Sequence, residues 1–372
     1  VLAGLAMVAA TAGTPVHADV ALGGSAVNIT PNGTYNGSNQ TSTNSVVVGY
    51  QNNAAGGPAN ESGKIIYGAA NTANRESSLA LGNQNKAINK SASAIGVGNT
   101  ASGEASVAMG NSSTASGDRS IAIGSGANAT EGAAVAIGRQ AEATGSSSVA
   151  LGYLNKATNN VAVGVGVNNK VSGQGATSVG STNVVTGDNS SVLGRQNTID
   201  GASVAGAVAV GYQNKASGDR AIAIGERNDS QKEDTISMGT HNTAAVGGAV
   251  AIGMDNVANS TLNGGRAAGN SQIAIGKNNQ ATQEDTIAIG RDNKASGSVS
   301  VAIGSRSEAT GAGSIALAGN GDGYKTTSTG LGSIAIGMQS NSTGVASTAV
   351  GGVSQATAKG ASALGFKANA TA

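Results

Sequence analysis

A five-residue pattern, Ser-Val-Ala-Ile-Gly or a close relative, recurs along most of the chain, with clear copies at 120–124, 148–152 and 300–304. The glycines that close successive copies are mostly 14 residues apart. At four places the spacing is longer, by 5, 3, 9 and 5 residues, and without these insertions the register holds from Gly49 to Gly365. A fixed period of this kind indicates a solenoid, in which each repeat packs only on its neighbours.

Each repeat predicts two short β-strands. The alternation Val/Ile–Ala–Val/Ile has the period of two of a strand, with one parity facing the interior of the coil. A second small apolar position lies five residues after the closing glycine, as at Ala87 and Ala101, and predicts the second strand. Two residues further on glycine is common, as at Gly103 and Gly117, and is expected to take φ > 0 in a tight corner. The prediction is an all-β fold, a parallel β-roll (solenoid) of 14-residue coils.

The middle residue of the first strand is nearly always alanine. We expect the flanking Val and Ile side chains to face the coil interior, which turns this alanine away from its own coil. A column facing solvent has no reason to exclude Lys, Glu or Gln, whereas close packing against another backbone does. The pattern therefore predicts that identical chains pack around a symmetry axis; the alternative is that small residues are tolerated on an exposed strand. The expected interface residues are Ala108, Ala122, Ala136, Ala150, Ala223, Ala251, Ala288 and Ala302.

Composition excludes several classes of protein. The 372 residues include one Phe, no Trp and 59 Gly, a mixture that fills thin layers but not the thick core of a large enzyme. The 21 basic and 20 acidic residues are balanced, so no basic field attracts nucleic acid or anionic lipid. Cysteine is absent and His241 is the one histidine after residue 18, which argues against disulfides, a thiolate or histidine-rich metal site and a catalytic relay. No cofactor is expected.

The N-terminal segment differs from the repeats. Residues 1–13 are apolar and rich in small residues, and Val16-His17-Ala18 resembles the cleavage site of a secretory signal. We expect residues 1–18 to be the remainder of a signal peptide and the mature chain to begin at Asp19; the alternative is an ordinary first strand. Residues 19–44 lie outside the register and are expected to form a tip or cap, and the β-roll is expected over 45–372.

The repeat resembles a known family. Ser-Val-Ala-Ile-Gly with its companion Asn-Lys-Ala-Ser-Gly is similar to the YadA-like head repeats of trimeric autotransporter adhesins, from about Ser45 to Ala372. The resemblance implies a left-handed, homotrimeric parallel β-roll on the bacterial outer membrane. It also implies attachment to host-cell receptors or extracellular matrix such as collagen, or bacterial clumping. The sequence shows neither sustained heptads nor a set of barrel strands, so the stalk and membrane anchor are expected to lie outside this fragment.

The residue after each closing glycine is the first candidate for ligand binding. In a straight stack these residues form one column, and Tyr, Arg, Met and Phe are enriched at interface cores. The alternative is that they pack on a neighbouring chain. The candidates are Tyr50, Arg139, Tyr153, Arg195, Tyr212, Met254, Arg291, Met338 and Phe366.

The insertions are the second candidate surface, because a coil accommodates extra residues by looping them outward. They fall near 57–62, 198–206, 259–270 and 319–332, and the alternative is that they are merely tolerated. Other functions remain open at this point. They are a structural or autoaggregation spacer, an ice-binding solenoid (although Thr is scattered) and an enzyme of the left-handed acyltransferase type, whose repeat has six residues rather than 14.

Overall fold

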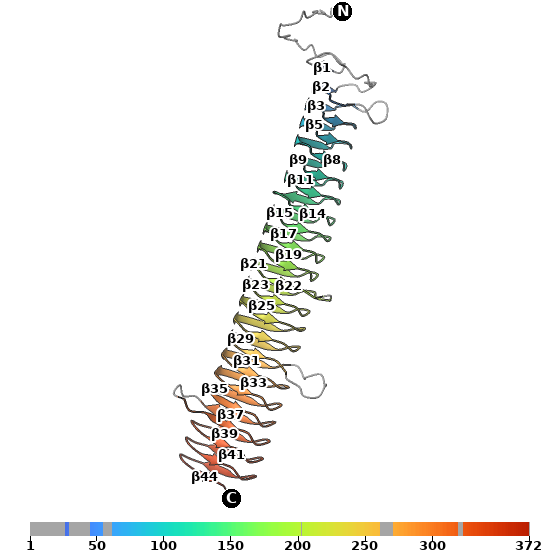
Figure 1. Ribbon diagram of the computed structural model, residues 1–372. Helices are drawn as coiled ribbons and strands as arrows, with labels where there is room; N and C mark the ends of the chain where they lie inside the picture. Colours follow the sequence, from blue (N-terminus) through green and yellow to red (C-terminus); the bar gives the residue numbers. More distant parts are fainter. Residues whose placement is uncertain are drawn as a thin grey trace, which may run out of the picture. The chain divides into compact units, whose positions relative to one another are not determined.

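The computed structural model describes residues 27–29, 45–54, 62–201, 203–260, 271–318 and 323–371. Every regular element in these residues is a β-strand (Figure 1). Accordingly, they contain no helix long and apolar enough to cross a membrane. Two units, Val1–Ala133 and Ala134–Ala372, are described separately below. The expected signal segment 1–18 lies outside the described residues, and so does the expected tip segment 19–44 apart from β1.

The first unit stacks coils that each contribute one long and one short strand. The long strands are β1 (Val27–Ile29), β2 (Val46–Tyr50), β3 (Ile65–Ala69), β5 (Leu79–Asn83), β7 (Ser93–Val97), β9 (Val107–Asn111) and β11 (Ile121–Ser125). The short strands are β4 (Thr72–Ala73), β6 (Lys86–Ala87), β8 (Thr100–Ala101), β10 (Thr114–Ala115) and β12 (Asn128–Ala129).

The second unit repeats this arrangement. Its long strands are β13 (Val135–Ile137), β15 (Val149–Tyr153), β17 (Val163–Val167), β19 (Thr177–Ser181), β21 (Ser191–Arg195), β23 (Val208–Tyr212), β25 (Ile222–Glu226), β27 (Ile236–Thr240), β29 (Val250–Met254), β31 (Ile273–Lys277), β33 (Ile287–Arg291), β35 (Val301–Ser305), β37 (Ile315–Ala318), β39 (Ile334–Ile336), β41 (Thr348–Val350) and β43 (Ser362–Leu364). Its short strands are β14 (Glu142–Ala143), β16 (Lys156–Ala157), β18 (Lys170–Val171), β20 (Val184–Val185), β22 (Thr198–Ile199), β24 (Lys215–Ala216), β26 (Asp229–Ser230), β28 (Thr243–Ala244), β30 (Val257–Ala258), β32 (Gln280–Ala281), β34 (Lys294–Ala295), β36 (Ser307–Ala309), β38 (Thr326–Ser328), β40 (Asn341–Ser342), β42 (Gln355–Ala356) and β44 (Asn369–Ala370).

Strands pair with the equivalent strand of the next coil, always in parallel. Ala122 of β11 lies opposite Ala108 of β9, and the closing glycines of successive coils are paired in the same way. The short strands form a second parallel sheet with the same one-coil step, for example between β24 and β26. The insertion after β22 does not disturb this register, because Arg195 still pairs with Tyr212. The predicted parallel solenoid of two-stranded, 14-residue coils is therefore confirmed.

The predicted facing of the long strands is wrong. The eight alanines expected to point away from the coil, Ala108, Ala122, Ala136, Ala150, Ala223, Ala251, Ala288 and Ala302, are all 0% exposed within a single chain. The flanking Val and Ile side chains are the ones that point outward, and they are half-buried or exposed. The coil is so thin that its interior holds mostly small side chains from each sheet, and most branched side chains lie on the outer face.

Volume compensation shows how tightly the two inner columns are matched. Where the long strand carries Gly164 instead of alanine, the short strand carries the larger Val171. A Cβ built on Gly164 would lie 3.5 Å from Val171 Cγ2, so the valine methyl occupies the space left by the missing side chain. Ser178 and Val185 pair small with large in the next coil. The compensation is local to such coils, because the following coil holds two large buried residues, Val192 and Ile199.

The corners also differ from their prediction. Left-handed φ occurs two residues after the closing glycine, as at His241 (φ 53°), and five residues before the next one, as at Asp234 (φ 55°). Gly103 and Gly117 do not have positive φ, so the expected φ > 0 at the seventh place is wrong. Glycine is needed there because a Cβ would lie 1.9 Å from the Gly117 carbonyl oxygen for Gly103, and 2.0 Å from that of Glu131 for Gly117. In these two coils close approach of the next coil, not a turn, leaves no room for a Cβ, whereas other coils carry Glu131 or Asn159 at the same place.

Candidate functional site

A ladder of buried asparagines runs along one corner of the coils, three residues after each closing glycine. Within the second unit it is unbroken over ten coils, and each member is at most 1% exposed. The recurring Asn-Lys pair is visible in the sequence, but the burial of its asparagine in a ladder is not. The ladder residues are Asn155, Asn169, Asn183, Asn197, Asn214, Asn228, Asn242, Asn256, Asn279 and Asn293.

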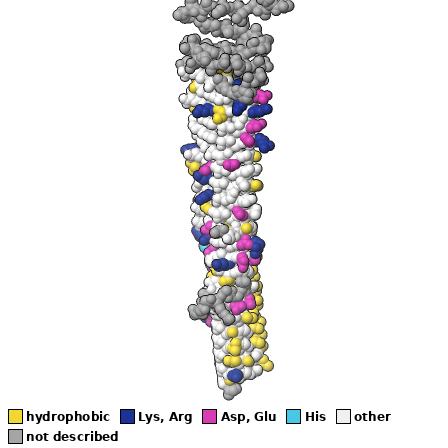
Figure 2. Space-filling model, turned by 90° about the vertical axis from the view of Figure 1, so that its right-hand side faces the viewer, with side chains coloured by type: hydrophobic (Ala, Val, Ile, Leu, Met, Phe, Trp, Pro, Cys, Tyr) yellow, Lys and Arg dark blue, Asp and Glu magenta, His cyan; other side chains and the backbone are white. Residues whose placement is uncertain are grey.

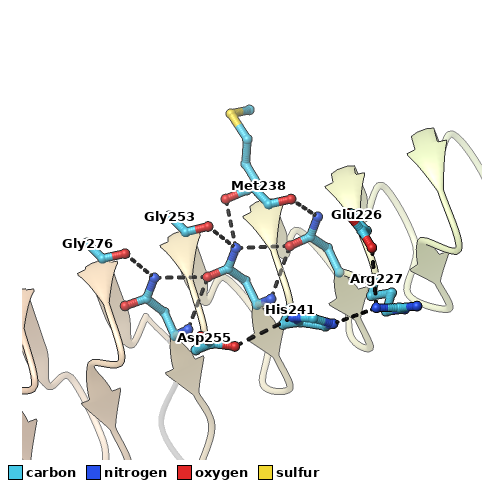
Figure 3. Close-up of polar contacts among 11 residues, drawn as sticks. Glu226, Arg227, Met238, His241, Gly253, Asp255 and Gly276 are labelled. Atoms are coloured by element: carbon cyan, nitrogen blue, oxygen red, sulfur yellow. Dashed lines mark hydrogen bonds and ion pairs between the residues drawn. The ribbon is translucent and has the colours of Figure 1, made fainter.

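An amide inside the ladder connects three coils (Figure 3). Asn242 Nδ2 donates to the carbonyl oxygens of Met238 (2.9 Å) and Gly253 (2.8 Å) and to Asn228 Oδ1 (2.9 Å). Its Oδ1 accepts from the backbone N–H (3.1 Å) and Nδ2 (2.9 Å) of Asn256. The ladder therefore joins backbone groups of neighbouring coils through side-chain amides, and a buried polar group that is fully hydrogen-bonded fixes the stacking of coils.

We expect Asn242→Ala to lower the free energy of unfolding by about 2 kcal/mol, because it leaves buried groups on Met238 and Asn256 without partners. The matched control is Asn242→Ser. At the equivalent place Ser113 Oγ donates to the Met109 and Gly124 carbonyl oxygens at 3.1 and 2.6 Å, so serine should cost about half as much. Urea titration followed by circular dichroism measures both. Equal stability of the alanine variant and the unsubstituted chain would contradict the role of the ladder.

The outer face of the long strands is apolar along both units. Most long strands carry two large side chains there, one on each side of the buried residue, such as Val250 and Ile252. In a few strands Ser or Thr takes the first of these places, as at Ser93 and Thr177. Leu193 is 53% exposed and Met238 39% exposed in a single chain. Figure 2 shows hydrophobic side chains gathering on one side of the C-terminal coils. A contiguous apolar stripe of this length is unusual on a monomer and marks an interaction surface.

The short strands face outward with polar side chains instead. Lys156, Lys170 and Lys215 stand on this face, each next to a buried alanine or valine. Lys156 Nζ pairs with Glu142 of the preceding coil at 2.7 Å. The two sheets of a coil therefore differ in character, because one outer face is apolar and the other is suited to water.

The corners carry most of the remaining charges. Arg220 donates from Nε to Asp234 Oδ1 at 2.7 Å and from Nη2 to Oδ2 at 2.9 Å, and it also contacts Asp219. The hydrogen bond from Arg220 lowers the pKa of the Asp234 carboxyl below its ordinary value. The hydrogen bond to Asp234, together with the charges of Asp219 and Asp234, raises the pKa of Arg220. Both groups are exposed, so this pair contributes little to stability.

A chain of polar contacts follows the corner at which the long strands end (Figure 3). Arg227 Nε donates to Gln213 Oε1 at 2.9 Å, and its Nη1 lies 3.3 Å from His241 Nε2 and 3.3 Å from Glu226 Oε1. His241 Nδ1 lies 3.6 Å from Asp255 Oδ1. Successive coils bring one corner residue each, so residues 14 apart in sequence become neighbours. The described residues hold no group of three His, Cys, Asp or Glu side chains that could bind a metal ion.

Comparison with protein families gives one match. The model of the YadA head domain repeat (2 copies) matches stretches that together cover more than half of the chain, at 87–113, 101–127, 129–155, 172–197, 205–226, 269–293, 295–317, 323–340 and 342–368. This chain belongs to the YadA head family. Its resemblance to the head of a YadA-like autotransporter adhesin is thereby confirmed, and adhesion is the kind of function that the family suggests. The search of curated proteins gave no match.

The head places most of the predicted ligand candidates in one column. In the second unit Arg195 pairs with Tyr212, and Lys277 pairs with Arg291. The Tyr212 ring lies 5.9 Å from the guanidinium carbons of both Arg195 and Arg227, a cation–π stack of three coils. The Tyr212 ring therefore has partners within its own chain, and its position does not require a ligand.

Other candidates differ in exposure. Tyr153 and Met254 are each 40% exposed and Phe366 is 70% exposed, whereas Met338 is half-buried. Arg139 lies 5.4 Å from the Tyr153 ring. Tyr50 ends β2 in the first unit, but its side chain lies outside what the structure describes.

The insertion near 198–206 is described apart from residue 202, and the one near 319–332 is described from residue 323 onward. At 198–206 the chain returns to the coil through buried Val204, and Asp188 bridges to Ala205. Asp200 Oδ1 accepts from Ser217 Oγ at 3.1 Å. Residues 55–61, 261–270 and 319–322 lie outside the described residues.

Proposed function

We propose that this chain is the head of a homotrimeric bacterial adhesin that attaches to host-cell receptors or extracellular matrix of the collagen type and performs no catalysis. The observation that carries the proposal is the apolar outer face of the long strands, which is open in a single chain. Burying it against two further copies removes up to two large side chains per coil from water in each copy. We further propose a left-handed coil, export through residues 1–18 and display at the outer membrane, as the family suggests.

The proposed interface is therefore formed by the outward Val and Ile columns, not by the alanines behind them. The alanines still matter, because they keep the coil thin and the outer face flat. Three copies also display every exposed site three times, which raises the apparent affinity of a weak site through avidity.

The column that follows the closing glycines is the proposed ligand surface. We expect Tyr153→Ala together with Tyr212→Ala to lower binding of the assembled head to its host ligand by about tenfold or more, because the exposed ring of Tyr153 and the half-buried ring of Tyr212 supply rigid contact area. Binding to an array of matrix proteins and host-cell surfaces measures this.

Lys170→Ala on the outward side of β18 is the matched control, and it should leave binding unchanged. The double tyrosine variant could instead assemble and bind as well as the unsubstituted head. That result would show that the column is not the ligand surface. In that case its residues pack on a neighbouring copy or on one another.

A further inference from the structure

Each long strand begins at one corner of the coil and ends at the other. Because the strands of the sheet are all parallel, their beginnings form one edge and their ends form the opposite edge. We call the sixth and fifth residues before each closing glycine the entry edge, and the two residues after it the exit edge. Glu284 and Asp285 belong to the entry edge of β33, and Arg291 and Asp292 to its exit edge.

The two edges of the second unit carry opposite charge. The described entry edge holds six acidic side chains against two basic ones, namely Asp188, Asp219, Glu233, Asp234, Glu284 and Asp285 against Arg220 and Lys359. The described exit edge holds seven basic side chains against three acidic ones, namely Arg139, Arg195, Arg227, Lys277, Arg291, Arg306 and Lys367 against Glu226, Asp255 and Asp292. These side chains are exposed or half-buried, so both edges are open to a partner.

Several of these charges have no counter-ion in their own chain. Among the described residues no ion pair engages Glu233, Glu284, Asp285 or Lys277. Arg195 has the Tyr212 ring as its neighbour rather than a carboxylate. The edges therefore retain unneutralised acid on one side and base on the other.

Geometry decides which edges meet when two copies pack through their apolar faces. If the stacks run parallel around a common axis, the exit edge of one copy lies beside the entry edge of the next. If they run antiparallel, like edges meet, which places acid against acid and base against base. Like charges in contact are unfavourable, and opposite charges select the partner orientation.

We propose that at β31 and β33 the exit edge of one copy binds the entry edge of the next copy at the same height, with Arg291 and Lys277 facing Glu284 and Asp285. Tyr153 and Tyr212 of the proposed ligand surface lie in other coils. The proposal rests on the self-association proposed above and names the contacts that orient it. The apolar columns are nearly identical from coil to coil. If one copy shifted by one coil along its neighbour, the apolar contacts would therefore be almost unchanged. The edge charges are unevenly distributed along the stack and therefore distinguish one height from another. Arg291 is then a contact between copies, the alternative to a ligand contact.

Cross-linking tests the arrangement directly, because the chain has no cysteine of its own. A chain carrying Glu284→Cys and Arg291→Cys has its two thiols on the order of 20 Å apart along one strand. A bis-maleimide shorter than that separation cannot join them within a copy. We expect the double variant to give covalent oligomers up to the full assembly, and the single variants to give no covalent product.

The solution mass, measured before cross-linking, separates the two proposals. An assembled head whose double variant does not cross-link, or whose single variants cross-link to themselves, would overturn the edge contacts and leave self-association standing. A monomeric head would overturn self-association and the edge contacts with it.

Charge reversal gives a second readout. Glu284→Lys with Asp285→Lys, or Lys277→Glu with Arg291→Glu, should each weaken association about tenfold at about 0.01 M salt and have little effect at about 1 M. Combining all four substitutions exchanges the edges and should restore association to within about twofold. Equal association of all three variants at low salt would overturn the pairing.

Discussion

A head with Ile252→Glu and Ile275→Glu is expected to stay folded and to lose its assembly. Both side chains lie on the outer face of the long strands, half-buried in a single chain. Burying one isoleucine contributes about 2 kcal/mol, and burying an unpaired carboxylate costs more, so each substituted copy loses at least about 4 kcal/mol of association free energy. Gel filtration with light scattering measures the mass, and circular dichroism measures the strand content.

The matched control is Ala251→Glu in the same strand. This alanine is 0% exposed inside the coil, so glutamate there should disrupt the coil itself and lower the strand content. The two substitutions thus separate the inner from the outer side of one strand. A glutamate pair at Ile252 and Ile275 that keeps the assembled mass would refute the outer face as the contact between copies.

Gly239→Ala is expected to cost at least about 4 kcal/mol of folding free energy, since it combines backbone strain with a steric clash. Gly239 closes its coil at φ 116°, and a Cβ built on it would lie 2.0 Å from the Gly253 carbonyl oxygen. The clash is with backbone, so neither coil can relieve it without moving away from the other. Thermal unfolding followed by circular dichroism measures the loss.

Gly360→Ala isolates the strain from the clash. Gly360 also has positive φ, 68°, but a Cβ there would meet nothing within 4 Å. We expect its cost to stay at about 1 kcal/mol, the ordinary penalty for a left-handed alanine. A loss of similar size for both variants would show that coil spacing does not select the closing glycine.

The period of the chain predicted its architecture well. A 14-residue repeat with Val/Ile–Ala–Val/Ile and a second small residue has few solutions other than two strands per coil, and the insertions were recognised because the register resumed after each one. The same feature explains why the family model matches so many stretches of one chain.

The facing of the strands could not be read from alternation alone. A period of two shows that Ala122 and its neighbours point to opposite sides of the strand. It does not show which side faces the interior of the coil. The prediction followed the rule that large apolar residues fill the core, and the thin coil reverses it. The buried partner position on the short strand, such as Ala87 or Ala101, was itself small in most coils. That pattern is the signal that the interior holds mainly small side chains.

Other features depend on contacts between coils that the sequence does not display. The spacing of Asn228 and Asn242 is visible, but the hydrogen bonds that join them follow from the stacking. The glycines at the seventh place were predicted as corners because a sequence shows where glycine occurs and not why. The charged edges likewise become visible only when each residue of the repeat has been placed at one corner or the other in the structure.

The central claim is that the outer Val and Ile columns of the long strands are buried between copies of this chain. Sedimentation equilibrium on the unsubstituted head tests it most directly. We predict a mass three times that of the single chain, independent of concentration over the micromolar range. A mass equal to one chain would contradict the claim.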